Sequence, residues 1–164
     1  MAYRGSYMWH LRRRVGHQLV VMPSVQVLLI DELDRVYLQR RRDLGTWEMP
    51  SGTCEPDSSF AQTAVREVAE ETGLMIEITD LVAFASLSDP AIQTVMYPNG
   101  DRTQCFSMCF LVRKWTGAIE IEGAEVLESS FFDPGRLPSP LHRSTEVALA
   151  LYRRFLESTT FQVR

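Results

Sequence analysis

The segment formed by residues 66–74 constrains this chain of 164 residues more than any other. It reads Arg-Glu-Val-Ala-Glu-Glu-Thr-Gly-Leu, and on a helix it places Glu67, Glu70 and Glu71 on one face, at spacings i, i+3 and i+4. A second face of that helix carries residues suited to packing: Ala61, Ala64, Val65, Val68 and Thr72. Like charges at these spacings destabilise a helix by a few tenths of a kcal/mol per pair, so the pattern predicts that the acidic face binds a cation. The alternative is a solvated acidic surface helix.

The residues around this helix favour the cation. Residues 52–74 resemble the Nudix box of the Nudix hydrolases, Gly-x5-Glu-x7-Arg-Glu-U-x-Glu-Glu-x-Gly-U, where U is aliphatic. Eight of the nine specified positions match: Gly52, Arg66, Glu67, Val68, Glu70, Glu71, Gly73 and Leu74. The resemblance implies an enzyme that cleaves the pyrophosphate bond of a nucleoside diphosphate linked to another group, X.

The ninth position departs from the box, because Ser58 stands where the family has its first Glu. We expect Ser58 to cap the helix by accepting a hydrogen bond from a free backbone N–H. We hypothesise that Asp57 or Glu55 partly replaces the missing carboxylate. If Ser58→Glu left turnover and metal affinity unchanged, the departure would have no functional effect.

The resemblance also implies a metal site. Glu70 and Glu71 are expected to be metal ligands, and Glu67 is expected to be either a third ligand or the general base. The backbone carbonyl of Ser51 or Gly52 would complete the coordination shell. Because Mg²⁺ prefers hard oxygen ligands of this kind, we expect Mg²⁺ as the cofactor, with Mn²⁺ as an alternative.

Two further residues receive catalytic roles from the resemblance. Arg66 is expected to orient Glu67, although at spacing i, i+4 it can instead form a surface ion pair with Glu70. The family often places an assisting acid on a later loop, and in the acidic stretch 120–128 we choose Glu125 for this role. The alternative for Glu125 is an exposed loop acid.

The substrate is less well defined by the sequence. Residues 47–52 and Pro90 resemble the ADP-ribose pyrophosphatase branch, whereas Leu11, residues 16–17 and the turn at 97–101 resemble a bacterial branch that includes nucleoside triphosphate hydrolases. The substrate is therefore expected to be of the ADP-ribose, nucleotide-sugar or nucleoside triphosphate type.

Three residues outside the box are candidates for binding this substrate. Arg40, Arg41 and Arg42 lie just before the box, and of these we choose Arg40 and Arg42 to contact phosphate. Trp47 would stack on a base, with ordinary packing as the alternative.

Composition limits the class of protein. The chain has 45% hydrophobic residues, which is enough to form one core. We therefore expect one domain over residues 1–164, with an N-terminal helical extension at 1–16. The net charge of −4 argues against nucleic-acid binding, and no apolar run predicts a membrane span or a signal peptide. We therefore expect a cytoplasmic protein, and the resemblance implies a homodimer. A catalytically silent Nudix-like module that binds a nucleotide is the competing interpretation.

The order of predicted elements favours an α/β fold. Helices are expected at 3–14, 59–72 and 144–158, the last capped by Ser144 or Thr145. Strands are expected at 25–30, 36–40, 47–49, 75–88, 103–115, 119–121 and 129–133. Together with the resemblance, this order implies the Nudix fold, an α/β/α sandwich with a mixed central sheet.

Overall fold

Two sheets and two long helices make up most of the computed structural model, which describes residues 5–121 and 125–164. The larger sheet has the order β4-β1-β7-β5-β9, with β6 paired to β7, and the smaller sheet has the order β3-β2-β8. The strands are β1 (Leu19–Leu29), β2 (Val36–Arg41), β3 (Trp47–Glu48), β4 (Ser51–Thr53), β5 (Val82–Leu87), β6 (Thr94–Met96), β7 (Arg102–Val112), β8 (Val126–Phe132) and β9 (Gln162–Val163). The helices are α1 (Tyr7–Val15), α2 (Phe60–Thr72), α3 (Pro90–Gln93) and α4 (Arg143–Ser158), with a short 3-10 turn, η1 (Ile78–Asp80).

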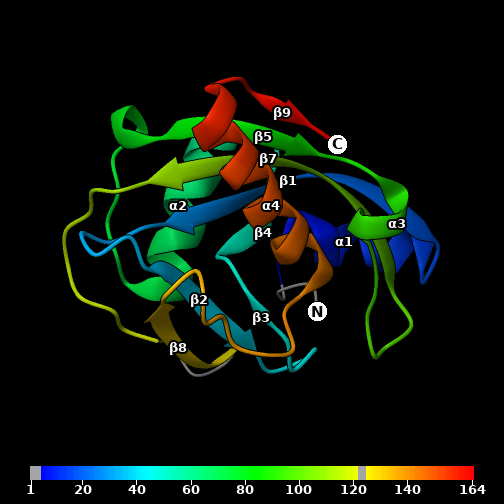
Figure 1. The fold of residues 1–164 in the computed structure, drawn as a ribbon. Coiled ribbons are helices and arrows are strands. Elements are labelled where there is room, and N and C mark those ends of the chain that lie inside the picture. The colour runs from blue at the N-terminus through cyan, green and yellow to red at the C-terminus, as the bar shows by residue number, and fades with distance from the viewer. Residues whose placement is uncertain (1–4, 122–124) are drawn as a thin grey trace.

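The larger sheet lies between α2 and α4 (Figure 1). Strand β1 pairs with β7 in parallel and with β4 antiparallel, so the sheet is mixed. Successive side chains of a strand point to opposite faces. In β1, Val27 and Leu29 pack against α2, while Leu28 and the following Ile30 pack against α4. The predicted α/β/α sandwich with a mixed central sheet is confirmed.

The sequence signals at the ends of α2 explain its position. Ser59 is the N-cap and forms a capping box with Gln62, in which each side chain satisfies a backbone N–H of the other residue. Gly73 ends the helix in the left-handed conformation, with φ 74°. The predicted helix is confirmed, but the cap expected at Ser58 is wrong, because Ser59 fills that position.

Several other predicted boundaries need correction. The strand expected at 75–88 is reduced to β5, preceded by η1, because residues 75–81 contribute only an isolated bridge from Met75 to Thr116. Within the described residues, 119–121 form no strand. The cap of α4 is His142 rather than Ser144 or Thr145.

At the N-terminal end of the chain two more boundaries shift. Strand β1 begins at Leu19, six residues before the start of the predicted strand at 25–30. The earlier start was not predicted because proline usually marks the edge of a strand, whereas Pro23 lies inside this one. Helix α1 starts at Tyr7, and the first part of the predicted helix at 3–14 lies outside the described residues.

Candidate active site

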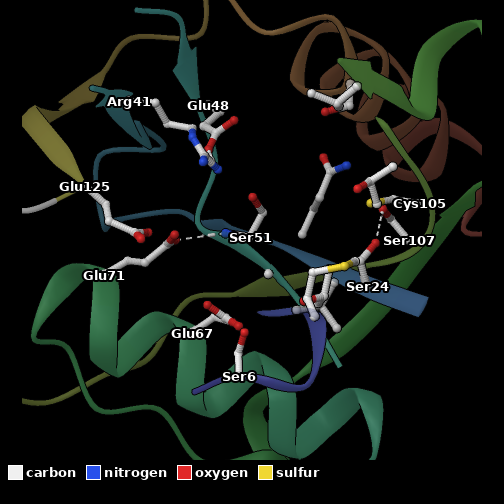
Figure 2. Close-up of a pocket in the computed structure, with 18 of the residues that line it drawn as sticks. Ser6, Ser24, Arg41, Glu48, Ser51, Glu67, Glu71, Cys105, Ser107 and Glu125 are labelled. Atoms are coloured by element: carbon white, nitrogen blue, oxygen red, sulfur yellow. Dashed lines mark hydrogen bonds and ion pairs between the residues drawn. The ribbon is translucent and has the colours of Figure 1, made fainter. Parts of the chain in front are cut away.

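A cavity of about 760 Å³ lies beside β4, the edge strand of the larger sheet. Its walls come from α2, β4, the end of β2, and the first turn of α1, and its floor comes from β1 and β7. Figure 2 shows Glu67 and Glu71 extending from α2 toward Ser51, with Glu48 and Arg41 across the cavity from them. One wall is therefore acidic, and it carries all three carboxylates of the box.

Glu71 is held from two strands. Its Oε2 accepts a hydrogen bond from the backbone N–H of Ser51 at 2.9 Å and another from Nε2 of Gln39 at 2.7 Å. Ser51 belongs to β4 and Gln39 to β2, so the smaller sheet and the edge of the larger sheet meet at this carboxylate. Glu71 is thus oriented before any ligand arrives.

Glu67 lies directly against the backbone of Gly52. A Cβ atom added at Gly52 would overlap the Glu67 carboxylate, so a larger residue at this position would have to displace that side chain. Nη2 of Arg66 lies 2.7 Å from Oε1 of Glu67, and Nη1 lies 2.9 Å from Oε2 of Glu70. Nη2 also donates to the carbonyl of Thr53 at 3.2 Å, which fixes the guanidinium above β4. The structure therefore combines the two roles considered for Arg66.

Burial makes this wall electrostatically strained. It raises the pKa of Glu67 to about 7, although the charge of Arg66 opposes the shift. Burial, followed by the charges of Glu67 and Glu48, raises the pKa of Glu71 well above its usual value. The pKa of Glu48 is also raised by burial, to about 7, and Arg41 opposes this shift from 3.2 Å.

The donor set fits a hard divalent cation. In the described part of the chain, no three His, Cys, Asp or Glu side chains are already arranged to hold a metal ion. Each box acid instead has a partner within the protein: Arg66 pairs with Glu67 and Glu70, and Ser51 and Gln39 donate hydrogen bonds to Glu71. Burial and neighbouring negative charges raise the pKa values of Glu67 and Glu71, so a cation would stabilise their charged forms, and carboxylate oxygens are the ligands that Mg²⁺ prefers.

Glu125, predicted as the assisting acid, also lines this cavity. It is the first described residue after 122–124. Its charge contributes to raising the pKa of both Glu67 and Glu48. The structure therefore brings it to the same site as the box acids.

The predicted substrate residues are not brought there. Arg40 pairs with Glu128 at 3.1 Å, and Trp47 is 8% exposed and packs edge-on against Phe132 at 5.0 Å between ring centroids. Neither residue lines the cavity, and Arg42 does not line it either. Packing, the alternative considered for Trp47, is what the structure shows.

Arg41 lines the cavity, although its neighbours Arg40 and Arg42 were the residues predicted to bind substrate. It pairs with Asp43 at 2.8 Å and with Glu48 at 3.2 Å. The signal was the period of two along β2, which places Arg41 on the same face as Gln39, the partner of Glu71. Glu48 pairs with Gln39 and Trp47 pairs with Arg40 across the two strands. Paired residues point to the same face of a sheet, so Trp47 and Arg40 both point to the face away from the cavity.

The loop that precedes α2 joins the site to α1. The carboxylate of Glu55 lines the cavity and accepts a hydrogen bond from the backbone N–H of Tyr7 at 2.9 Å. Asp57 is exposed and does not line the cavity. Of the two acids considered as replacements for the missing box Glu, only Glu55 is at the site.

Comparisons with known proteins show to which family the chain is related. A family model described as NUDIX domain matches residues 20–155. A "MutT-like protein" of Streptomyces ambofaciens is 41% identical over 58 residues, which span 35% of this chain and 38% of that protein. None of the helices in the described part of the chain is long and apolar enough to cross a membrane.

Two solved structures share the fold. An ADP-ribose pyrophosphatase from Streptococcus suis superposes with a TM-score of 0.64 and 24% identity, covering 87% of this chain and 98% of that one. The NUDIX domain of Shewanella oneidensis NrtR, crystallised with ADP ribose, has a TM-score of 0.67 and 20% identity, covering 84% and 89%. At these identities the likeness shows the fold alone, whereas the family model spans most of the sequence and includes the acidic helix. The chain belongs to the Nudix family.

Proposed function

We propose that this protein is a divalent-cation-dependent hydrolase that cleaves the pyrophosphate bond of a nucleoside diphosphate linked to a group X. The observation that carries the proposal is the cavity itself. Its volume of about 760 Å³ is in the usual range for a small-molecule site, and its lining gathers the box carboxylates with Glu48 and Glu125. Mg²⁺ is the proposed cofactor, with Mn²⁺ as an alternative.

Glu70 and Glu71 are proposed as the principal metal ligands, together with a backbone carbonyl of Ser51 or Gly52, and Glu67 is proposed either as a third ligand or as the general base. A divalent cation bound there would neutralise phosphate oxygens and acidify a bound water. Because phosphoanhydride oxygens are negative, they approach this acidic wall only when its charge is compensated in this way.

The remaining steps belong to the protein's own groups. Arg66 pairs with Oε1 of Glu67, which leaves Oε2 to take the proton of the attacking water. The water oxygen forms the new bond to phosphorus, the bridging P–O bond breaks, and the products leave as a nucleoside monophosphate and phosphorylated X. Glu125 is the second candidate for the proton acceptor, because it lines the same cavity.

The proposed substrate type is based on the relatives and on the sequence. The Streptococcus suis relative is named an ADP-ribose pyrophosphatase and the NrtR domain holds ADP ribose, which supports a nucleoside diphosphate derivative for this chain. A nucleoside triphosphate is the alternative, supported by the sequence resemblance to the bacterial branch.

A panel of substrates tests the proposal. Purified protein is incubated with ADP-ribose, nucleotide sugars, dinucleoside polyphosphates and nucleoside triphosphates, with Mg²⁺, with Mn²⁺ or with EDTA, and each product is identified. We expect hydrolysis of at least one anhydride that EDTA abolishes. Glu70→Gln should lose most of the turnover with the fold intact, and Glu157→Gln, an exposed acid on α4, is the matched control. A blank panel with both metals would favour the silent nucleotide-binding module instead.

A further inference from the structure

The two hydrogen bonds that hold Glu71 end on the same carboxylate oxygen. The backbone N–H of Ser51 (Figure 2) and Nε2 of Gln39 both donate to Oε2, at 2.9 Å and 2.7 Å. A carboxylate oxygen has about two lone-pair sites, so these two donors fill Oε2. No hydrogen bond to Oε1 is found within residues 5–121 and 125–164, and Glu71 lines the cavity. Glu71 therefore offers a bound ion one oxygen rather than two.

Both donors belong to paired strands, which keeps them in place. Ser51 lies on β4, which pairs with β1. Gln39 lies on β2, the central strand of the smaller sheet, where it pairs with Glu48 of β3 and with Ser129 of β8. Gln39 is 0% exposed, so water does not compete for its amide. Because a buried donor is costly to leave without an acceptor, Gln39 keeps its bond to Glu71 when a ligand binds.

The other two acids of the box are restricted less firmly. Nη2 of Arg66 lies 2.7 Å from Oε1 of Glu67, and Nη1 lies 2.9 Å from Oε2 of Glu70, so Arg66 also contacts one oxygen of each carboxylate. The side chains of Arg66 and Glu70 are 35% and 59% exposed, and water can replace such an ion pair. Among these contacts, the buried bond from Gln39 is the one that a bound ion does not displace.

The number of oxygens that a carboxylate offers discriminates between divalent cations. Ca²⁺ takes about 6–8 oxygen ligands at about 2.3–2.6 Å and often binds both oxygens of one carboxylate. Mg²⁺ is smaller, demands octahedral geometry at about 2.0–2.1 Å and retains several waters, so one oxygen from each carboxylate suffices. A Glu71 with only Oε1 available therefore suits Mg²⁺ better than Ca²⁺.

We propose that Gln39 is a positioning residue that makes the site selective for Mg²⁺ over Ca²⁺, because it occupies Oε2 of Glu71 and leaves Oε1 as the ligand atom. The inference rests on the proposed function in taking Glu71 as a metal ligand. It goes further, because Gln39 lies outside the box and acts on the cation through Glu71.

Metal binding without substrate tests the inference. Mn²⁺, which also takes octahedral oxygen sites, is titrated into the protein, and its free-ion EPR signal gives the bound fraction while Mg²⁺ or Ca²⁺ competes. The variants are Gln39→Met, which keeps the length of the side chain and removes the donor, and Gln39→Asn, whose amide is one methylene too short. In both, the ratio of Ca²⁺ affinity to Mg²⁺ affinity should rise about tenfold over the wild type, because Oε2 is released.

Gln104→Met is the matched control and should keep the wild-type ratio. Gln104 lies between Thr103 and Cys105 on β7, and since these two line the cavity, Gln104 points to the opposite face of the sheet. Thermal melts show whether each variant is folded. General damage to the site would lower both affinities together and leave the ratio unchanged.

A crystal structure of the wild type with Mn²⁺ decides the question even if neither Gln39 variant folds, and it should show Oε1 of Glu71 on the ion without Oε2. Both oxygens on the ion, or an unchanged ratio in folded variants, would overturn the inference. Hydrolysis that EDTA abolishes would still support the proposed function in that case. A raised ratio together with a blank hydrolysis panel would leave the inference standing while the proposed function failed.

Discussion

At the scale of single residues, Gly52 and Glu67 show how tightly the candidate site is built. Replacing Gly52 by Ala adds a Cβ that overlaps the Glu67 carboxylate, while the backbone of Gly52 needs no left-handed conformation. We therefore predict that Gly52→Ala displaces Glu67 and lowers kcat by about 100-fold, the usual effect of a misplaced catalytic group, without unfolding the protein. Steady-state kinetics and thermal melts of the variant check this. Gly135→Ala, in an exposed turn, should behave as wild type, and so would Gly52→Ala if Glu67 had no role.

A second residue-scale prediction concerns Glu71. Its replacement by Gln keeps an acceptor for Ser51 but removes a buried charge, so the metal-free variant should be at least as stable as the wild type. Because a ligand that binds only the folded state stabilises it, Mg²⁺ should raise the melting temperature of the wild type and not that of Glu71→Gln. Differential scanning fluorimetry with Mg²⁺ and with EDTA measures both shifts. An equal Mg²⁺ shift in the two proteins would remove Glu71 from the ligand set.

At the scale of elements, Arg12 connects α1 to the residues that follow this helix and to the hairpin formed by β6 and β7. Nη1 of Arg12 donates to the carbonyl of Gln18 at 2.6 Å, and Nη2 donates to Oγ1 of Thr103 at 2.9 Å. Nε of the same guanidinium lies 3.7 Å from Asp101, which also contacts Nδ1 of His17 at 2.8 Å. Helix α1, the helix of the predicted N-terminal extension, is therefore part of a wall of the cavity, held by Arg12 near its C-terminal end and by Glu55 at its N-terminal end.

This fastening predicts a pH-dependent stability. Partial burial favours the neutral form of Asp101, but hydrogen bonds from Asn99 and His17 and the charge of Arg12 outweigh it and lower the pKa of Asp101. A carboxylate whose folded-state pKa is lowered stabilises the fold above its unfolded pKa of about 4 and loses that contribution as the pH falls through the folded value. Asp101→Asn should therefore lower the free energy of unfolding by about 1 kcal/mol at pH 7 and by progressively less toward pH 3.

Urea denaturation between pH 7 and pH 3 measures this difference. Asp57→Asn, at an exposed acid, should match the wild type throughout. A difference for Asp101→Asn that stays constant with pH would mean that the side chain acts through its shape rather than its charge.

The elements also show what the sequence could predict. The range of α2 was predictable because helix ends carry local signals such as Gly73, although the cap was expected one residue early, at Ser58 instead of Ser59. The segment 75–81 was not, because a strand needs a neighbour in space, and here only Met75 finds one. The same holds for Gln39, whose acceptor Glu71 lies 32 residues further along the chain.

At the scale of the whole molecule, α4 packs against residues of both sheets and with them forms one of two hydrophobic clusters. The larger hydrophobic cluster contains residues of β1, β2, β5 and α4. Phe84 is fully buried at its centre, with its ring 5.6 Å from that of Tyr152 and 6.2 Å from that of Phe155. The fold class was predictable because this core follows from the alternation and order of apolar segments. The choice among Arg40, Arg41 and Arg42 required the register between β2 and β3.

Phe84→Ala tests this view of the core. Removing a fully buried ring leaves a cavity, so we expect the free energy of unfolding to fall by about 3–5 kcal/mol. Phe106→Ala on β7, where the side chain is 45% exposed, should cost less than about 1 kcal/mol. Chemical denaturation of both variants measures the contrast. Similar losses would mean that the buried ring stabilises the fold no more than the exposed one.

Helix α2 serves both the interior and the chemistry, since Ala64 and Val68 pack on the sheet while Glu67 and Glu71 line the cavity. A laboratory lineage selected for heat resistance through repacking beneath this helix would tilt it and thereby alter the reaction rate in the same step. Libraries aimed at thermal tolerance alone are better directed to the outer surface of α4, where a sequence change leaves the acids in place.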